Sequence, residues 1–190
     1  MSTPAVFLDR DGTLIEEAGY LDRVDRITLF PWTVDALRML RRAGFALVVI
    51  TNQSGIGRGL IDEAFVESTH RALDERLETG GARVDGYYHC PHHPQADLEA
   101  YRIQCDCRKP ATGLFTKAIA ALDIDPARSF GVGDRWQDLE PAIALSARGV
   151  LVKTGYGVSA LARPSARVAA AHVADNLMDA TTWILRQHGS

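Results

Sequence analysis

The sequence of 190 residues has few cysteines, no long hydrophobic run and no marked excess of charge of either sign. Its three cysteines all lie between positions 90 and 107, and an odd, clustered set does not suit a disulfide framework. No stretch is apolar over the roughly 18 residues that a membrane span requires. Asp9, Arg10 and Asp11 interrupt the apolar run near the N-terminus, which excludes a secretion signal there. We therefore expect a cytoplasmic protein.

The charge and length of the chain narrow its partners and its organisation. A net charge of −3 gives no electrostatic footprint for nucleic acid or for an anionic membrane. A chain of this length is expected to form one domain, residues 1–190, with a sizeable core. We expect a monomer that acts on a small molecule and binds neither nucleic acid nor a membrane.

The segment Val6–Thr13 places two aspartates directly after an apolar run. Such an uninterrupted run is typical of a buried parallel strand, whose carboxyl end is where open α/β sheets bind ligands. Asp9 and Asp11 would repel each other unless a cation or a shared proton relieves them. Mg²⁺, which prefers carboxylate and phosphate oxygens, is the natural cation. The alternatives are a polar turn and half of a calcium-binding loop, but no second half of an EF-hand follows.

The second apolar run, 45–50, ends in a segment rich in hydroxyl, amide and glycine residues. Thr51, Asn52, Gln53 and Ser54 lead into three glycines between 55 and 59, a composition that suits a phosphate cradle. A flexible glycine-rich loop is the alternative. A helical pattern lies between the two runs, so the three segments predict a right-handed parallel βαβ unit.

The remaining pattern predicts further strands and helices. We expect Asp62 and Thr112 to cap helices and His70, which lies off the apolar stripe of its helix, to face solvent. The expected strands lie at about 5–9, 45–50, 84–89, 129–134, 149–153 and 171–174, and the expected helices at about 33–43, 62–78, 112–122, 139–147 and 176–186.

The clustered cysteines fit a structural zinc site in an insertion at about 90–107. Cys90, His92, Cys105 and Cys107 form a Cys₃His set with tight C-x-H and C-x-C pairs, a closed composition typical of structural zinc. His93 is an alternative to His92 that spacing does not decide. Buried thiols clustered by chance, or a redox pair, are the other interpretations.

Two further segments carry charged residues that suit a phosphate or a metal ion. Arg108 and Lys109 stand between the expected zinc site and a helix start, where they suit phosphate contact. Asp134 ends a strand and would lie near Asp9 if the two strands are neighbours, completing a carboxylate set for Mg²⁺. Asp138 either supports that set or belongs to the first turn of the next helix.

Together these motifs resemble the haloacid dehalogenase superfamily of phosphohydrolases over nearly the whole chain. The segments FLDRDGTL, VVITNQSGIGRG, YHCPHHP, CDCRKP and VGD are similar to its heptose-bisphosphate and histidinol-phosphate phosphatase branch, whose members carry this zinc loop. The resemblance implies an α/β, Rossmann-like three-layer sandwich with a mainly parallel sheet and no large cap domain. It also implies a Mg²⁺-dependent phosphomonoesterase with a structural Zn²⁺.

The resemblance implies roles for individual residues. Asp9 attacks phosphorus, and Asp11 protonates the leaving oxygen and then accepts a proton from water. Asp9, Asp134 and the main-chain carbonyl of Asp11 hold Mg²⁺, while Thr51, Asn52 and Lys109 stabilise the transferring phosphoryl group. The implied substrate contacts are Glu17, Ala18, Gly19, Tyr20, Thr51, Asn52, Gln53, Ser54, Arg108, Lys109 and Arg135. Arg135 departs from the lysine that is usual in the family, which bears on the substrate more than on the reaction.

Two alternative functions remain beside a sugar bisphosphate phosphatase. Hydrolysis of histidinol phosphate, a cationic substrate, would favour acidic residues such as Glu16, Glu17 or Asp22 near the pocket. A catalytically silent, zinc-stabilised phosphate-binding module would be expected to lack Asp9, Asp11 or Asp134, and the sequence contains all three.

Overall fold

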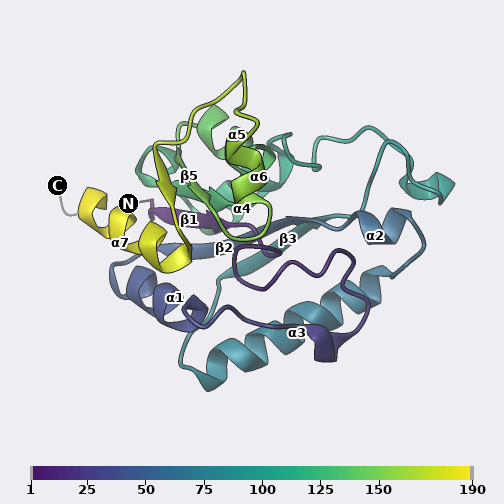
Figure 1. Cartoon of the computed structure of the whole chain (residues 1–190), viewed down its shortest axis with the longest axis horizontal. Helices are drawn as coiled ribbons and strands as arrows, with labels where there is room; N and C mark the ends of the chain where they lie inside the picture. Colours follow the sequence, from purple (N-terminus) through teal and green to yellow (C-terminus); the bar gives the residue numbers. More distant parts are fainter. Residues whose placement is uncertain (1, 189–190) are drawn as a thin grey trace.

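The computed structural model describes residues 2–188 and has three layers, a central sheet between two layers of helices (Figure 1). The strands are β1 (Ala5–Leu8), β2 (Ala46–Asn52), β3 (Gly86–Cys90), β4 (Phe130–Gly133), β5 (Arg148–Val152) and β6 (His172–Ala174). They pair in the order β3-β2-β1-β4-β5-β6, and every pair is parallel. The α/β, Rossmann-like prediction is confirmed.

Two groups of helices cover the two faces of the sheet. The helices are α1 (Thr33–Arg42), α2 (Ser54–Gly57), α3 (Glu63–Thr79), α4 (Gly113–Leu122), α5 (Trp136–Ala144), α6 (Gly157–Leu161) and α7 (Leu177–His188). Three short 3₁₀ helices lie at Val24–Arg26, Glu99–Tyr101 and Pro126–Arg128. In Figure 1, α1, α3 and α7 lie on one side of the sheet and α4, α5 and α6 on the other. None of the helices in residues 2–188 is long and apolar enough to cross a membrane.

Burial on both faces explains why β1 is apolar throughout. Val6 and Leu8 belong to the core beneath α1, α3 and α7, whereas Phe7 belongs to the core beneath α4. The ring of Phe7 lies 5.0 Å from that of Phe115 on α4. Burying each such side chain contributes about 1.5–3 kcal/mol, so both faces anchor the strand that carries Asp9 at its end.

Element boundaries agree with the prediction to within a few residues, with two informative differences at helix starts. Asp62 caps α3 as expected, because its carboxylate accepts a hydrogen bond from the Phe65 amide at 2.7 Å. Thr112 precedes α4 but makes no side-chain cap. Helix α5 begins at Trp136, earlier than predicted, since the Asp138 carboxylate accepts a hydrogen bond from the Arg135 amide at 2.9 Å and starts the helix.

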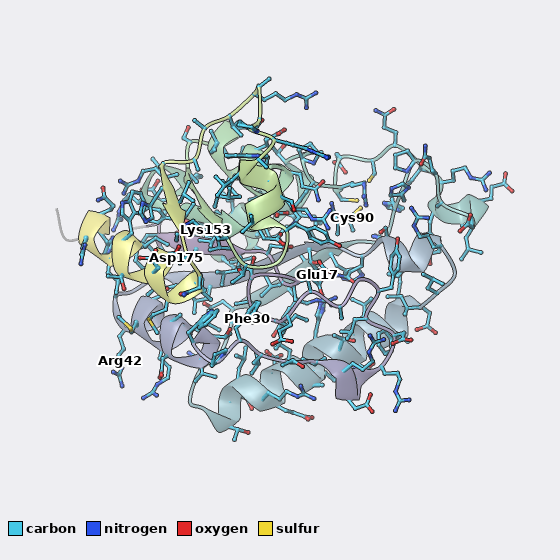
Figure 2. All side chains as sticks on the ribbon, in the orientation of Figure 1. Glu17, Phe30, Arg42, Cys90, Lys153 and Asp175 are labelled. Carbon is cyan, nitrogen blue, oxygen red and sulfur yellow. The ribbon has the colours of Figure 1, made fainter. Side chains whose placement is uncertain are left out.

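The carboxyl ends of β1 and β4 lie side by side at the point where the order of the strands reverses. Strands β1 to β3 extend to one side and β4 to β6 to the other, which is the switch point at which open α/β sheets bind ligands. The Asp9 amide donates to the Val132 carbonyl of β4 at 2.9 Å. Figure 2 shows that Cys90 and Glu17 lie toward this end of the sheet, while Arg42 lies toward the opposite end.

One expectation about local environment is wrong, and one loop has more structure than expected. His70 is 8% exposed rather than solvated, because α3 packs on β3 and the His70 ring stacks on Tyr87 with centroids 4.4 Å apart. The glycine-rich segment forms the helical turn α2, and its main-chain amides at 56, 58, 59 and 60 donate to carbonyls within the segment. Thr51 to Gly55 line the cavity, so the predicted phosphate cradle stays a prediction for that part of the segment.

Candidate active site

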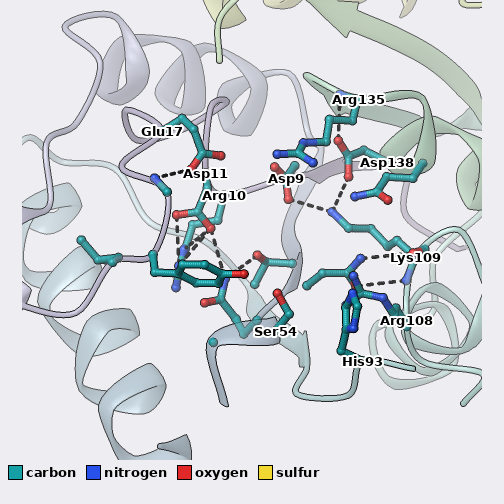
Figure 3. A pocket seen from close by; sticks show the side chains of 18 of the residues that line it. Asp9, Arg10, Asp11, Glu17, Ser54, His93, Arg108, Lys109, Arg135 and Asp138 are labelled. Atoms are coloured by element: carbon teal, nitrogen blue, oxygen red, sulfur yellow. Dashed lines mark hydrogen bonds and ion pairs between the residues drawn. The ribbon is translucent and has the colours of Figure 1, made fainter. Parts of the chain in front are cut away.

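A cavity of about 330 Å³ opens at the carboxyl edge of the sheet (Figure 3). The predicted site residues that line it are Asp9, Asp11, Glu17, Gly19, Tyr20, Thr51, Asn52, Gln53, Ser54, Arg108, Lys109 and Arg135. Ala18 is not among the lining residues, and Asp134 lies beneath the cavity with 1% of its surface exposed. The segments that follow β1, β2, β3 and β4 therefore converge on one polar site.

Lys109 lies between two carboxylates at the base of the cavity. Its Nζ donates to Asp9 Oδ1 at 2.7 Å and lies 2.8 Å from Asp138 Oδ1, and it also donates to the Ile50 carbonyl at 2.7 Å. Burial raises the pKa of Asp9 well above its ordinary value, while Lys109 opposes that shift. Burial lowers the pKa of Lys109, but Asp138 and Asp9 outweigh it and raise that pKa above its ordinary value. Asp138 therefore has both roles considered for it, as part of the site and of the first turn of α5.

Three carboxylates form a group suited to a divalent cation. Asp9, Asp134 and Asp138 each offer an oxygen, and these oxygens lie within 4.8 Å of one another. Burial and the neighbouring Asp138 raise the pKa of Asp134 to about 7. Asp134 Oδ2 accepts from the Tyr156 amide at 2.6 Å, so Oδ1 remains to face a metal. The hard oxygen donors and the repulsion among three buried carboxylates fit Mg²⁺.

Asp11 lies apart from that carboxylate group. Arg10 Nε donates to Asp11 Oδ2 at 3.1 Å, Arg10 Nη2 donates to Oδ1 at 3.1 Å, and Gln53 Nε2 donates to Oδ2 at 3.1 Å. Gln53 Nε2 also donates to Thr51 Oγ1 at 2.8 Å. The amide of Gln53 is thus used within the protein, and its predicted contact with a substrate stays a prediction.

Asn52 orders the main chain of Lys109. Its Nδ2 donates to the Lys109 carbonyl at 3.1 Å, and its Oδ1 accepts from the Lys109 amide at 3.0 Å. The end of β2 and the segment after the cysteines are therefore joined by two hydrogen bonds. Direct contact of Asn52 with a phosphoryl group, predicted above, stays a prediction.

The rim of the cavity carries three arginines without a carboxylate partner in the part of the chain that the structure describes. The Arg135 guanidinium lies 3.7 Å above the Tyr156 ring, and that of Arg58 lies 5.9 Å from the Tyr20 ring. Arg108 Nη1 donates to a main-chain carbonyl, that of residue 92, at 2.9 Å. Rings and a carbonyl hold these cations without neutralising them, so they suit an anionic ligand.

The cysteine cluster has the composition and spacing of a zinc site. One atom from each of Cys90, His92, Cys105 and Cys107 lies within 4.8 Å of the others, and His93 is not in that group. The sulfur–sulfur distances run from 3.1 to 3.6 Å. Zinc–sulfur bonds of about 2.3 Å in a tetrahedron imply roughly 3.8 Å, and a disulfide about 2 Å, so the arrangement fits zinc. Between His92 and His93, the geometry selects His92.

Several lining residues were not predicted as site residues. Arg10, Arg58 and His93 stand inside or beside the quoted motifs, so their sequence positions carried a usable signal. Gln137 and Tyr156 had none, because only the fold of the loops after β4 and β5 brings them to the cavity. His93 faces the cavity rather than the zinc group.

Comparison with known proteins gives one consistent set of relatives. A family model described as polynucleotide kinase 3 phosphatase matches residues 5–139, and one described as HAD-hydrolase-like matches residues 106–180. The D-glycero-beta-D-manno-heptose-1,7-bisphosphate 7-phosphatase of Escherichia coli O6:H1 is 44% identical over 187 residues, covering 98% of this chain and 96% of that protein. The protein of the same name from Salmonella typhi is 43% identical, with 98% and 97% covered.

A solved structure is similar over the same length. The D,D-heptose 1,7-bisphosphate phosphatase from B. bronchiseptica, complexed with magnesium and phosphate, has a TM-score of 0.85 and 30% identity. The alignment covers 97% of this chain and 99% of that one.

Proposed function

Because this chain belongs to the haloacid dehalogenase (HAD) superfamily of phosphatases, we propose that it removes the 7-phosphate of D-glycero-D-manno-heptose 1,7-bisphosphate through an aspartyl-phosphate. The observation that carries this proposal is the position of Asp9, which lies at the switch point of the sheet beside Lys109 and two further carboxylates. The names of the relatives support the substrate. Such a product would be a precursor for nucleotide-activated heptose.

The first half of the reaction forms a bond between Asp9 and phosphorus. An Asp9 carboxylate oxygen attacks the 7-phosphoryl group, and the bond from phosphorus to the sugar oxygen breaks. Asp11 gives its proton to that sugar oxygen as it leaves. A carboxylate nucleophile splits one difficult displacement into two easier ones.

The second half restores the enzyme. Water attacks phosphorus and gives a proton to Asp11, while the bond between phosphorus and the Asp9 oxygen breaks. Inorganic phosphate leaves, and Asp9 returns as a carboxylate with Asp11 protonated. Lys109 and Thr51 line the cavity, where the Lys109 ammonium would neutralise charge on the phosphoryl oxygens and the Thr51 hydroxyl would donate a hydrogen bond to them.

Metal ions have separate tasks in this proposal. Asp9 and Asp134, with the Asp11 carbonyl, would hold Mg²⁺, which supplies charge neutralisation between the nucleophile and the phosphate. The zinc group has four protein ligands, so it leaves no open position for chemistry and would hold the loop that ends at Arg108. Both cofactors remain proposals for this chain.

The charges at the rim favour a bisphosphate over histidinol phosphate. Arg58, Arg108 and Arg135 have no carboxylate partner within residues 2–188, and a second phosphate would pair with them. Of the acidic residues that a cationic substrate would favour, Glu17 lines the cavity, whereas Glu16 and Asp22 do not. The predicted contact between Arg108 and the second phosphate belongs to this proposal.

The test is phosphate release with Mg²⁺ from heptose 1,7-bisphosphate and from histidinol phosphate, measured side by side. We expect a strong preference for the bisphosphate, and no turnover with Asp9→Asn at unchanged zinc content. Preference for histidinol phosphate would overturn the substrate and keep the mechanism. Substantial turnover by Asp9→Asn would overturn the covalent mechanism.

A further inference from the structure

A buried arginine lies in the chain between the two aspartates of the site. Arg10 is 2% exposed and heads the largest fully buried side chains in the described region. Removing a guanidinium from water costs several kcal/mol unless it is paired and hydrogen-bonded. An apolar side chain would fill this position equally well, so packing does not explain why the buried residue is charged.

The contacts of Arg10 give that reason, because they are directed at one carboxylate. Its Nε and Nη2 donate to both oxygens of Asp11 at 3.1 Å, and Nη2 lies 2.9 Å from Oδ2. Gln53 adds a third donor at 3.1 Å (Figure 3). A planar fork that binds both oxygens fixes the orientation of a carboxylate as well as its position.

Arg10 makes its close contacts with one anion, although the carboxylate of Glu17 also lies within its electrostatic reach. In residues 2–188, its Nη1 is buried without a hydrogen-bond partner and Asp11 is its ion-pair partner in the one salt bridge it forms. The rings of His70, Tyr87 and His89 are within its electrostatic reach. Burial and the charge of Arg10 lower the pKa of His70 to about 3, so that ring is neutral at neutral pH. Asp11 is therefore the carboxylate that Arg10 contacts directly.

The Asp11 side chain is also separate from the carboxylates that suit a metal. The group with oxygens within 4.8 Å of one another contains Asp9, Asp134 and Asp138, and Asp11 is not a member. A fourth carboxylate that turned toward Mg²⁺ would become a metal ligand and would no longer be available to carry a proton. The hydrogen bonds from Arg10 and Gln53 hold it in its present position.

The geometry points to Arg10, assisted by Gln53, as a positioning residue that holds the Asp11 carboxyl in one orientation and away from the metal ligands. This inference rests on the acid/base role of Asp11 proposed above. It assigns a function to a side chain that need not touch the substrate. Its effect should therefore appear in proton transfer to the leaving group rather than in binding.

Substrates that differ in their leaving group separate these two effects. A sugar alkoxide must be protonated as it leaves, whereas 4-nitrophenolate leaves readily without a proton. The ratio kcat/KM reports events up to the departure of this group. Disturbance of Asp11 should lower kcat/KM for a sugar phosphate far more than for 4-nitrophenyl phosphate, while damage to binding or folding should lower both alike.

The experiment compares Arg10→Met, Arg10→Lys and Gln53→Leu with the unaltered protein, all loaded with zinc and assayed with Mg²⁺. We expect Arg10→Met to lower kcat/KM about 100-fold for heptose 1,7-bisphosphate and about threefold or less for 4-nitrophenyl phosphate. Gln53→Leu should lower kcat/KM for heptose 1,7-bisphosphate by about tenfold. Arg10→Lys keeps the charge but loses the two-pronged contact, so its kcat/KM for this substrate should lie between those of the unaltered protein and Arg10→Met.

Arg41→Met is the matched control. Arg41 also pairs with a carboxylate, Asp85, but at the opposite end of the sheet, so both substrates should react as before. Equal losses for the two substrates in Arg10→Met, or no loss, would overturn the inference. If Arg10→Met loses zinc or fails to fold, Gln53→Leu carries the same comparison. If the unaltered protein hydrolyses no heptose bisphosphate, glycerol 3-phosphate replaces it, and the proposed substrate fails separately from the positioning role.

Discussion

The two groups of metal-binding side chains in this molecule are assembled in opposite ways. The cysteines and His92 come from one short stretch of the chain, from Cys90 at the end of β3 to Cys107. Asp9, Asp134 and Asp138 come from β1, β4 and α5, and the pairing of β1 with β4 brings them together. The first group is local in sequence, and the second is a product of the whole fold.

The two groups also differ in how the protein offsets the charge of their side chains when no metal is bound. Lys109 lies between Asp9 and Asp138, so a cation of the protein itself relieves part of their repulsion. Near the thiols the charge of Arg108 interacts with Cys90 and Cys105, yet burial raises the pKa of Cys90, which favours its neutral form. Zinc binding would have to displace that proton, and the binding energy would then stabilise the loop. Removing metal should therefore disturb the loop more than the sheet edge.

The largest effect should follow from removing the protein's own cation. Lys109→Met leaves Asp9 and Asp138 buried without a counter-charge, and breaking such a pair costs about 3–5 kcal/mol. We expect the melting temperature to fall by roughly 10 °C and turnover to fall by about 1000-fold. Calorimetry and phosphate release measure the two effects.

Lys153→Met is the control for that variant, because Lys153 pairs with Asp175 at 2.6 Å but on the surface. Exposed pairs contribute little, so neither quantity should change measurably. Similar changes in the two variants would contradict the claim that Lys109 stabilises the site by offsetting the charges of Asp9 and Asp138.

Removing one thiol tests the local group. Cys107→Ser should release zinc and lower the melting temperature by roughly 5–10 °C, since four ligands close this site. Turnover should fall as well, because Arg108 and Lys109 follow directly in the chain. His93→Gln should retain zinc, as His93 lies outside the ligand group. Zinc content, measured by mass spectrometry, tests the ligand set of three cysteines and His92. Zinc loss in His93→Gln would contradict that set.

The carboxylate group should bind Mg²⁺ more weakly in acid. Burial and Asp138 raise the pKa of Asp134 to about 7, so below that pH a proton must leave before a metal binds. We expect the Kd for Mg²⁺, measured by titration calorimetry, to be about tenfold higher at pH 6 than at pH 8. The same Kd at both pH values would show that Asp134 is not titrating in this range.

The smallest expected effect concerns the buried ring of His70. Unfolded chain takes up a proton at His70 below about pH 6.5, whereas the folded chain does so only near pH 3. The unfolded state therefore binds more protons between these values, and the free energy of unfolding falls as the pH falls from 6.5. His70→Phe should remove roughly 1 kcal/mol of the stability difference between pH 7.5 and 5.5. A pH dependence as steep as that of the unaltered protein would contradict a neutral, buried His70.

Much of the framework could be predicted because it depends on short patterns. Uninterrupted apolar runs mark parallel strands buried on both faces, and that rule located β1 and β2 and, from them, the position of Asp9. The proximity of Asp134 to Asp9 followed from treating their strands as neighbours, which the structure confirms. The zinc ligands needed spacing alone, except that His92 and His93 could be separated only in three dimensions.

The remainder depends on contacts between segments far apart in sequence. A histidine off the apolar stripe of α3 is predicted to be exposed, but β3 presents Tyr87 to that side and buries it. The glycine-rich segment is predicted as an open loop, yet a helical turn uses its main-chain amides at 56, 58, 59 and 60. The sequence pattern makes no prediction for the Arg10 side chain, whose burial close to His70 on α3 and Tyr87 on β3 appears only in three dimensions.

Two glycines adjacent to Asp134 have a consequence for how this site can change over evolutionary time. A Cβ atom added at Gly12 or at Gly155 would meet the Asp134 carboxylate, and both residues have a positive φ, +81° and +54°. No other residue fits at either position without moving a proposed metal ligand. Tyr20 and Tyr156, by contrast, stand at the rim with much of their surface exposed. Substitutions should therefore be tolerated more readily at the rim than at these two glycines, so that a change of substrate can arise there while the chemistry beneath is inherited unaltered.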